Sequence, residues 1–117
     1  MKTLAKATMT ALTTFGLWAG FAHAHTQLAS SIPANEAVVE TAPEEVSLTF
    51  SEPVRLTAVS VESGGTSHSL DVGSREAAKE FTIALPALTS GMHVVQWRAL
   101  SEDTHVMTGE IHFTVSP

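Results

Sequence analysis

Two short stretches of the chain carry side chains that bind metal ions. Asp103-Thr104-His105 places a carboxylate and an imidazole two residues apart. Because alternate residues of an extended backbone project to the same side, both groups can converge on one ion. Taken alone the pattern is weak, since a turn aspartate beside a solvent-exposed histidine has the same spacing. The second stretch, Ala22-His23-Ala24-His25, adds weight, because a chain cut after Ala24 would begin with a histidine.

The first 24 residues have the three parts of a cleavable secretory signal. Lys2 and Lys6 precede an apolar run that ends at Ala22, and an Ala-x-Ala pattern follows. A membrane anchor is the competing interpretation, but the run contains several threonines and glycines and is shorter than the roughly 20 strongly apolar residues that a span needs. We therefore expect residues 1–24 to be a signal peptide and residues 25–117 to form the exported domain.

An N-terminal histidine would chelate a transition metal. His25 would offer its α-amine and its ring Nδ1 to the same ion. His105 adds a third nitrogen, and the Asp103 carboxylate can take the remaining in-plane position. Cu(II) prefers such a tetragonal set of nitrogen and oxygen ligands and also heads the divalent affinity order. Because an α-amine titrates near ~7.7–8.0 and histidine near ~6.5, we expect binding to weaken as the pH falls below neutrality.

Composition excludes several other classes of protein. Of six basic residues, Lys2 and Lys6 precede the cleavage point, so the 93 residues that remain of 117 hold four basic and twelve acidic residues, a formal charge of −8. That charge disfavours nucleic acid and anionic lipid as partners, and after cleavage we expect no membrane insertion. A chain of this length forms one small domain. The absence of cysteine excludes zinc–thiolate sites, iron–sulfur clusters, blue-copper ligation and cysteine nucleophiles.

Alternation of apolar and polar side chains predicts about seven short strands and no convincing helix. An edge strand covers Gln27 to Ser31, before a turn that begins at Pro33. In the next strand Pro53 interrupts the pattern, which puts Glu52 where the ladder is broken. The expected inward faces are Val46, Leu48 and Phe50; Thr57, Val59 and Val61; Phe81, Ile83 and Leu85; His93, Val95, Trp97 and Ala99; and Ile111, Phe113 and Val115. Such a pattern favours an antiparallel β-sandwich or a Greek-key barrel.

The other histidines have structural or surface explanations. His23 would leave with the signal peptide. His112 alternates with inward-facing apolar residues and is expected to face solvent. His93 lies on the same strand face as Trp97, which predicts a packed or hydrogen-bonded side chain. His68 follows a Gly-Gly turn and is expected to be exposed.

A set of short motifs also follows a fixed order along the chain. The motifs are His25-Thr-Gln-Leu28, Ser31-Ile-Pro33-Ala34, Pro43, Leu48-Thr-Phe50-Ser51-Glu52-Pro53, Trp97-Arg98-Ala99-Leu100-Ser101-Glu102-Asp103-Thr104-His105, Thr108-Gly109 and Phe113-Thr-Val115. In this order they resemble the CopC family of periplasmic copper-resistance proteins. The resemblance covers essentially the whole exported chain. Its most specific parts are the first residue and the block from Trp97 to His105.

The resemblance implies a cupredoxin-like, immunoglobulin-like Greek-key fold that binds Cu(II) at its N-terminal edge. By position, His25, Asp103 and His105 match the family's Cu(II) ligands. Glu52 matches a carboxylate placed near that site in some members, and it ranks below the other three. Some members also bind Cu(I) through a methionine-rich loop with a histidine. His68 stands at that place without a thioether, which argues against a Cu(I) site because soft Cu(I) prefers sulfur.

These features together predict a periplasmic Cu(II)-binding protein for copper buffering, transport or resistance, and not an enzyme. The resemblance implies a CopD-like inner-membrane copper transporter, or other periplasmic copper proteins, as partners. Two alternatives stay open. A copper-dependent polysaccharide oxygenase also uses an N-terminal histidine, although Asp103 would block the position that oxygen needs and the aromatic residues are expected to face inward. A metal-free immunoglobulin-like interaction module would not depend on the N-terminus.

Overall fold

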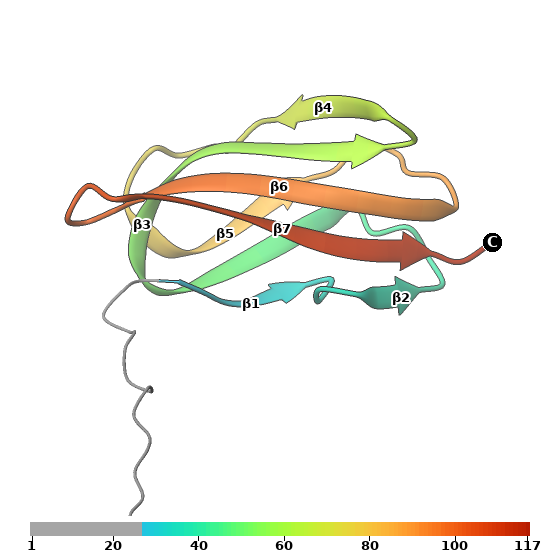
Figure 1. The fold of residues 1–117 in the computed structure, drawn as a ribbon, viewed down its shortest axis with the longest axis horizontal. Helices are drawn as coiled ribbons and strands as arrows, with labels where there is room; N and C mark the ends of the chain where they lie inside the picture. Colours follow the sequence, from blue (N-terminus) through green and yellow to red (C-terminus); the bar gives the residue numbers. More distant parts are fainter. Residues whose placement is uncertain (1–26) are drawn as a thin grey trace, which may run out of the picture.

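The computed structural model describes residues 27–117, which fold into seven β-strands without a helix (Figure 1). The strands are β1 (Leu28–Ile32), β2 (Ala37–Val39), β3 (Glu45–Ser63), β4 (Thr66–Leu70), β5 (Ala78–Ala84), β6 (Gly91–Ser101) and β7 (Val106–Val115). The all-β class predicted from alternation is confirmed. Within these residues no helix is long and apolar enough to span a membrane. The expected signal peptide, residues 1–24, and His25 lie outside the described residues.

Strand β3 pairs with four of the other strands, β1, β4, β5 and β6. Its first half pairs with β1 and β5, and its second half pairs with β4 and β6. The pairing changes around Pro53, because proline has no N–H to give to a ladder: the register with β5 shifts before Val54, and pairing with β6 begins there. The strand itself runs on through Pro53. The predicted interruption is therefore wrong for the strand and right for its pairing.

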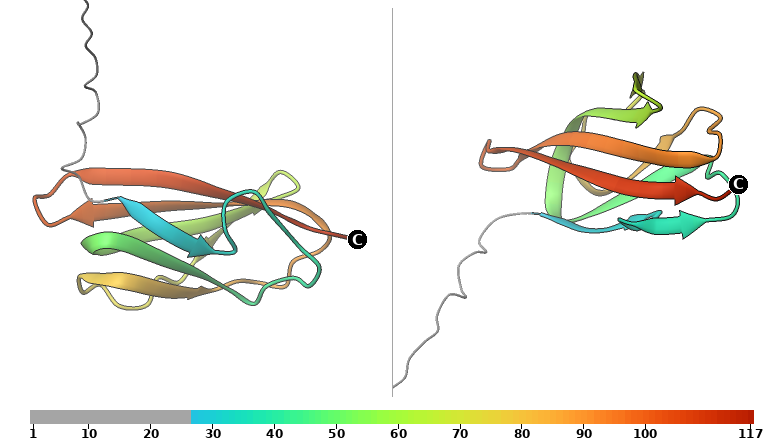
Figure 2. Two further views of the ribbon diagram at one scale, coloured as in Figure 1. Left: turned by 90° about the horizontal axis from the view of Figure 1, so that it is seen from below. Right: turned by 45° about the vertical axis from the view of Figure 1, so that its right-hand side comes forward.

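The strand order β1-β3-β6-β7-β2, with β4 and β5 also paired to β3, makes one curled sheet (Figure 2). Its two halves enclose the core. The pairs are antiparallel as predicted, except that β2 runs parallel to β7, with Ala37 beside Phe113. The exception arises because β1 and β2 belong to one edge segment that keeps its direction while it moves from β3 to β7 (Figure 1).

The core confirms most of the predicted inward faces. Its buried apolar residues are Val46, Leu48, Phe50, Val54, Leu56, Val59, Val61, Phe81, Ile83, Val95, Trp97, Ala99, Ile111, Phe113 and Val115. Thr57 is an error of the prediction, because it is exposed while Val59 and Val61 are buried. A register shift between Leu56 and Ala58 marks a β-bulge, which changes the face on which the next side chain lies.

His93 is a buried polar residue at the end of the sheet near the β3–β4 hairpin. Its Nε2 lies 2.7 Å from the carbonyl oxygen of Thr89, which can only accept, so Nε2 carries the proton. The hydroxyl of Ser63 then donates to Nδ1 across 2.5 Å. The prediction of a packed, hydrogen-bonded histidine is confirmed. This imidazole links the end of β3 to the segment before β6.

Trp97 packs closely against the backbone of β7. Its ring meets Phe50 edge to face, with centroids 5.1 Å apart, and lies directly under Gly109. A β-carbon built on Gly109 would lie 2.5 Å from Cζ2 of the indole. The indole Nε1 is buried without a hydrogen-bond partner. The glycine is therefore required by close packing rather than by an unusual backbone angle.

We expect Gly109→Ala to destabilise the fold by about 1–3 kcal/mol, because the new methyl group overpacks a rigid ring inside the core. Urea unfolding followed by circular dichroism measures the change. Thr108→Ala, at the neighbouring exposed position, is the control and should stay within about 0.5 kcal/mol of the parent. An unchanged midpoint for Gly109→Ala would show that Trp97 can move at little cost.

Candidate metal centre

One buried serine organises the turn between β6 and β7. Ser101 is 8% exposed. Its backbone N–H donates to the carbonyl of His105 at 2.9 Å, and its carbonyl accepts from the N–H of Thr104 at 2.9 Å. Its hydroxyl donates to Oδ1 of Asp103 and accepts from the backbone N–H of His105 at 3.1 Å. Both candidate ligands of the turn are thus bound to one side chain.

The backbone of the turn bends sharply between the two candidates. Thr104 has φ of +67°, in the left-handed region, where a β-branched residue is strained. Such strain persists where surrounding contacts hold it, and it often accompanies function. Asp103 and His105 do come together, but through this turn and not along the extended backbone that the sequence analysis assumed.

The two side chains form an exposed pair. Oδ2 of Asp103 lies 3.3 Å from Nδ1 of His105, and the side chains are 70% and 68% exposed. The hydrogen bond from Ser101 is the main cause that lowers the pKa of Asp103 from its ordinary value; desolvation opposes it, and the electrostatic interaction with His105 adds to the lowering. The carboxylate is therefore ionised at neutral pH. A proton on Nδ1 would leave the Nε2 lone pair of a neutral His105 to a metal.

Three separate segments meet at this end of the molecule. Gln27 and Ser51 are joined by two hydrogen bonds, from Gln27 N to Ser51 Oγ at 3.0 Å and from Ser51 N to Gln27 O at 2.9 Å. Three residues later, Val54 pairs with Ser101 at the start of the turn. The entry into β1, the change of partners in β3 and the β6–β7 turn therefore lie at one end (Figure 1).

The described residues supply only part of a metal site. Within residues 27–117, no group of three or more His, Asp or Glu side chains is placed to hold an ion. Glu52 is exposed and does not join Asp103 and His105 in such a group. His25 lies outside the described residues. The described residues thus provide a carboxylate–imidazole pair, and a metal ion bound by this pair would need further ligands.

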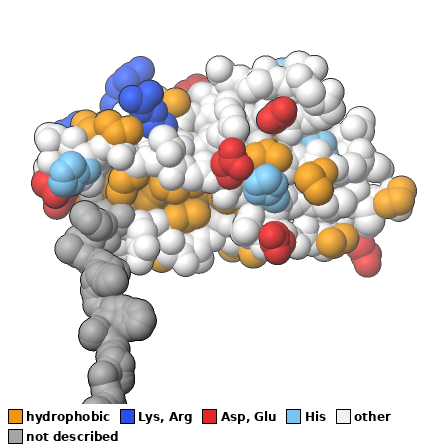
Figure 3. All heavy atoms as spheres, viewed as in Figure 1, with side chains coloured by type: hydrophobic (Ala, Val, Ile, Leu, Met, Phe, Trp, Pro, Cys, Tyr) orange, Lys and Arg blue, Asp and Glu red, His pale blue; other side chains and the backbone are white. Residues whose placement is uncertain are grey.

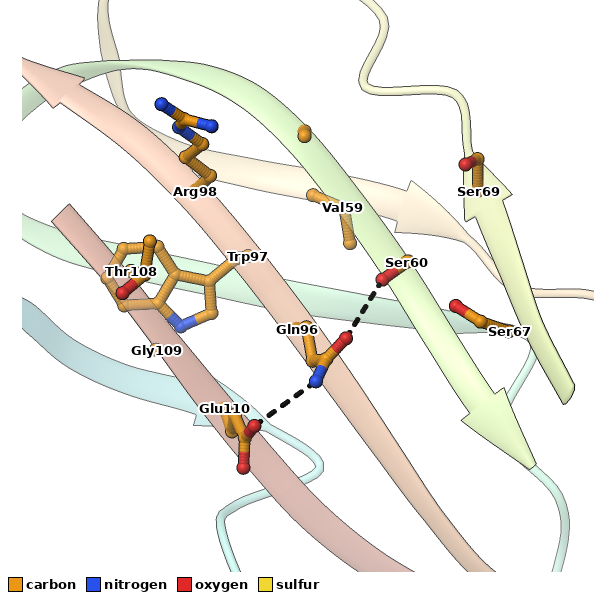
Figure 4. Close-up of a pocket in the computed structure, with 11 residues that line it drawn as sticks. Val59, Ser60, Ser67, Ser69, Gln96, Trp97, Arg98, Thr108, Gly109 and Glu110 are labelled. Atoms are coloured by element: carbon orange, nitrogen blue, oxygen red, sulfur yellow. Dashed lines mark hydrogen bonds between the residues drawn. The ribbon is translucent and has the colours of Figure 1, made fainter. Parts of the chain in front are cut away.

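A second carboxylate–histidine pair lies on the outer face of β7. Nε2 of His112 is 3.0 Å from Oε1 of Glu110. Glu110 lines a groove of about 480 Å³ (Figure 4). Gln96 donates to Oε2 of Glu110 at 3.1 Å and accepts from Ser60 at 3.4 Å. The hydrogen bond that Gln96 donates, and after it the one that His112 donates, lowers the pKa of Glu110. These groups satisfy one another and offer no third ligand.

His68, on β4, is exposed, so its predicted exposure is confirmed.

The sequence pattern did not reveal the part played by Ser101, which was named only as one residue of the motif from Trp97 to His105. The available signal was the spacing Ser101-x-Asp103, because serine and aspartate commonly make local hydrogen bonds two residues apart. Which of several polar turn residues is buried could not be inferred from that spacing.

The CopC domain model matches residues 28–116 of the chain. The chain belongs to the CopC family. The resemblance drawn from the motifs is thereby confirmed, and the matched residues include β1 to β7 together with the Ser101–His105 turn.

Two relatives share this family and most of the chain length. Copper resistance protein C of Escherichia coli is 36% identical over 121 residues, covering 90% of this chain and 94% of the relative. Copper resistance protein C of Pseudomonas syringae pv. tomato is 35% identical, covering 85% of this chain and 86% of the relative.

Solved structures of CopC proteins have the same fold. CopC from Methylosinus trichosporium OB3b aligns with a TM-score of 0.68 at 30% identity, covering 80% of this chain and 95% of that one. PcoC, a methionine-rich copper resistance protein from Escherichia coli, aligns with a TM-score of 0.57 at 32% identity, covering 80% and 100%. The predicted β-sandwich or barrel class is confirmed.

We expect Ser101→Ala to raise the pKa of Asp103 toward its ordinary value, because the largest cause of its lowering is the serine hydroxyl. A carbon-detected NMR titration of the Asp103 carboxyl measures this. Since a lowered pKa contributes stability that is lost as the pH falls through it, the variant should lose less stability on acidification. Ser116→Ala, remote from the turn, is the control. An unmoved Asp103 titration would assign the lowering to His105 instead.

Proposed function

We propose that this CopC-family chain is a periplasmic Cu(II)-binding protein that buffers or carries copper in copper resistance, and that it is not an enzyme. The observation that carries the proposal is the Asp103–His105 pair, held by Ser101 at the end of the molecule where β1 begins. The name Copper resistance protein C, borne by both relatives, supports copper as the metal.

The remaining ligands come from the start of the exported chain. We infer that cleavage after Ala24 leaves His25 first, so that its amine and imidazole join Asp103 and His105 around Cu(II). One residue separates His25 from Gln27, which Ser51 holds at this end, and two residues of chain reach about 7 Å. Glu52 follows Ser51 directly and remains a lower-ranked ligand.

The observations disfavour the two alternative functions and a Cu(I) site. All four aromatic residues among residues 27–117 are buried, so this part of the chain has no flat stacking surface for a polysaccharide. A metal-free interaction module gives no reason for the strained turn that holds Asp103 beside His105. Met92 and Met107 lie on β6 and β7, and no methionine occurs in β3, β4 or the hairpin between them that carries His68, so we propose no Cu(I) site.

The partners follow from a role in carrying copper. A periplasmic carrier must give copper to another protein or receive copper from one. We propose a CopD-like transporter of the inner membrane, or other periplasmic copper proteins, for that exchange.

We expect one alanine inserted between Ala24 and His25 to weaken Cu(II) binding by at least about tenfold and to change the EPR spectrum, because the imidazole and the free amine would then belong to different residues. Both proteins are expressed from the full sequence and purified after export, and mass spectrometry identifies the first residue of each. Insertion of alanine after Pro117 is the control. Unchanged affinity and spectrum would show that the N-terminus is not a ligand.

We expect Asp103→Ala to weaken Cu(II) binding by at least about tenfold and to alter the EPR parameters while the β-sheet stays folded. The neighbouring exposed Glu102→Ala removes the same charge and should retain the parent spectrum. Circular dichroism checks the fold of both variants. Equal effects of the two substitutions would mean that the ion senses only the local charge, and Asp103 would leave the ligand set.

A further inference from the structure

The basic residues of the described chain gather at one end, although the chain as a whole is acidic. Residues 27–117 contain four of them, Arg55, Arg75, Lys79 and Arg98, against twelve acidic residues. Arg55 follows the residue of β3 that pairs with Ser101, and its Nη1 donates to the carbonyl of Arg75 at 3.1 Å. Lys79 follows the residue of β5 that pairs with the same part of β3. Figure 3 shows Lys and Arg side chains clustered at the end that carries the β6–β7 turn.

None of these four cations is neutralised by a carboxylate. Among residues 27–117, the ion pairs are those of Asp103 with His105 and of Glu110 with His112. All four basic side chains are exposed. Glu102 lines the same hollow as Arg55 without forming an ion pair with it. The charges of the four cations are therefore available to an acidic group outside this chain.

Apolar side chains lie between the cations. Leu100 of β6 is opposite Arg55 of β3 on one side and opposite Val106 of β7 on the other. Val106 is 55% exposed, and two residue pairs further along Arg98 projects from the same face beside Thr108 (Figure 4). Arginine beside exposed aliphatic groups is typical of surfaces that bind other proteins.

Two shallow hollows shape this face. One, of about 420 Å³, is lined by Arg55, Leu100, Glu102 and Thr104 among others. The second, of about 340 Å³, includes Arg98, Leu100 and Val106. Leu100 lines both hollows, so they adjoin. Because Thr104 lies between Asp103 and His105, a molecule seated in the first hollow would touch the turn of the candidate metal centre.

We propose that this basic face, formed by Arg55, Arg75, Lys79, Arg98, Leu100 and Val106, docks an acidic segment of a partner protein that also carries an aliphatic side chain. Carboxylates suit arginine because the guanidinium binds them through two parallel hydrogen bonds. A compact acidic segment fits better than a polyanion such as nucleic acid or an anionic bilayer, because the net charge of −8 repels an extended negative surface. Docking here would bring the partner beside the proposed copper ligands.

The test uses copper-free exported protein labelled with ¹⁵N, so the docking proposal and the copper proposal can fail separately. The probe is a twelve-residue peptide in which Asp and Leu alternate, with Ser at the remaining positions. The control peptide has the same sequence with Asn in place of each Asp. In 150 mM salt we expect the acidic peptide to shift the amides of Arg55, Arg98, Leu100 and Val106. An equal response to the Asn peptide, or shifts spread over the surface, would overturn the proposal.

Matched variants separate the face from net charge. Arg55→Gln with Arg98→Gln should weaken binding of the acidic peptide about fivefold, as the loss of two exposed charge pairs implies. Thr66→Glu with Ser67→Glu makes the same change of net charge at the opposite end of the sheet and should leave the dissociation constant within about twofold. Equal weakening by both pairs would mean that only net charge is sensed. The protein is tested in the same way with phosphatidylglycerol vesicles. If it binds them as tightly as the peptide, with the same dependence on the two arginines, the ligand of this face is a bilayer and the proposal of a partner protein is wrong.

Discussion

Strand β3 must serve both halves of the sheet, and the positions of the other elements follow from that constraint. Because proline cannot donate to a ladder, β3 exchanges partners around Pro53 while its backbone continues. The exchange brings β1 to one side and β6 to the other at a single end of the molecule. The start of β1 and the Ser101–His105 turn are neighbours for this reason, although about 75 residues of chain separate them.

The turn itself is arranged at some cost to the fold. Thr104 is strained, and an exposed carboxylate–imidazole pair adds little stability. The hydrogen bonds of Ser101 nevertheless hold the Asp103 carboxylate and the backbone of His105 in place, so an ion bound here would have less to order. Charge is divided in the same region: the acidic chain as a whole attracts cations, while the basic face beside the turn presents the opposite sign. In the two proposals, one end of the molecule thus binds a metal ion and an acidic partner through adjoining surfaces.

Local patterns were predictable and choices between distant partners were not. Alternation assigned the inward faces of β6 and β7, because each buried side has to be continuously apolar. The inward-facing Thr57 was predicted wrongly because the position of a bulge depends on how β3 pairs with β6. The parallel pairing of β2 was not predicted because an edge segment can join either half of the sheet. At the site, residue types indicated Asp103 and His105, whereas the role of Ser101 depends on burial that only the assembled turn creates.

The close packing of Trp97 on Gly109 has an optical consequence. The sequence contains two tryptophans, Trp18 and Trp97, and removal of the first 24 residues would leave one. An indole that is 7% exposed, with Nε1 unpartnered, should emit at short wavelength and shift to the red when the sheet opens. Since Trp97 lies four residues before Ser101 on the same strand, the protein carries a built-in fluorophore whose signal comes from the core beside the turn.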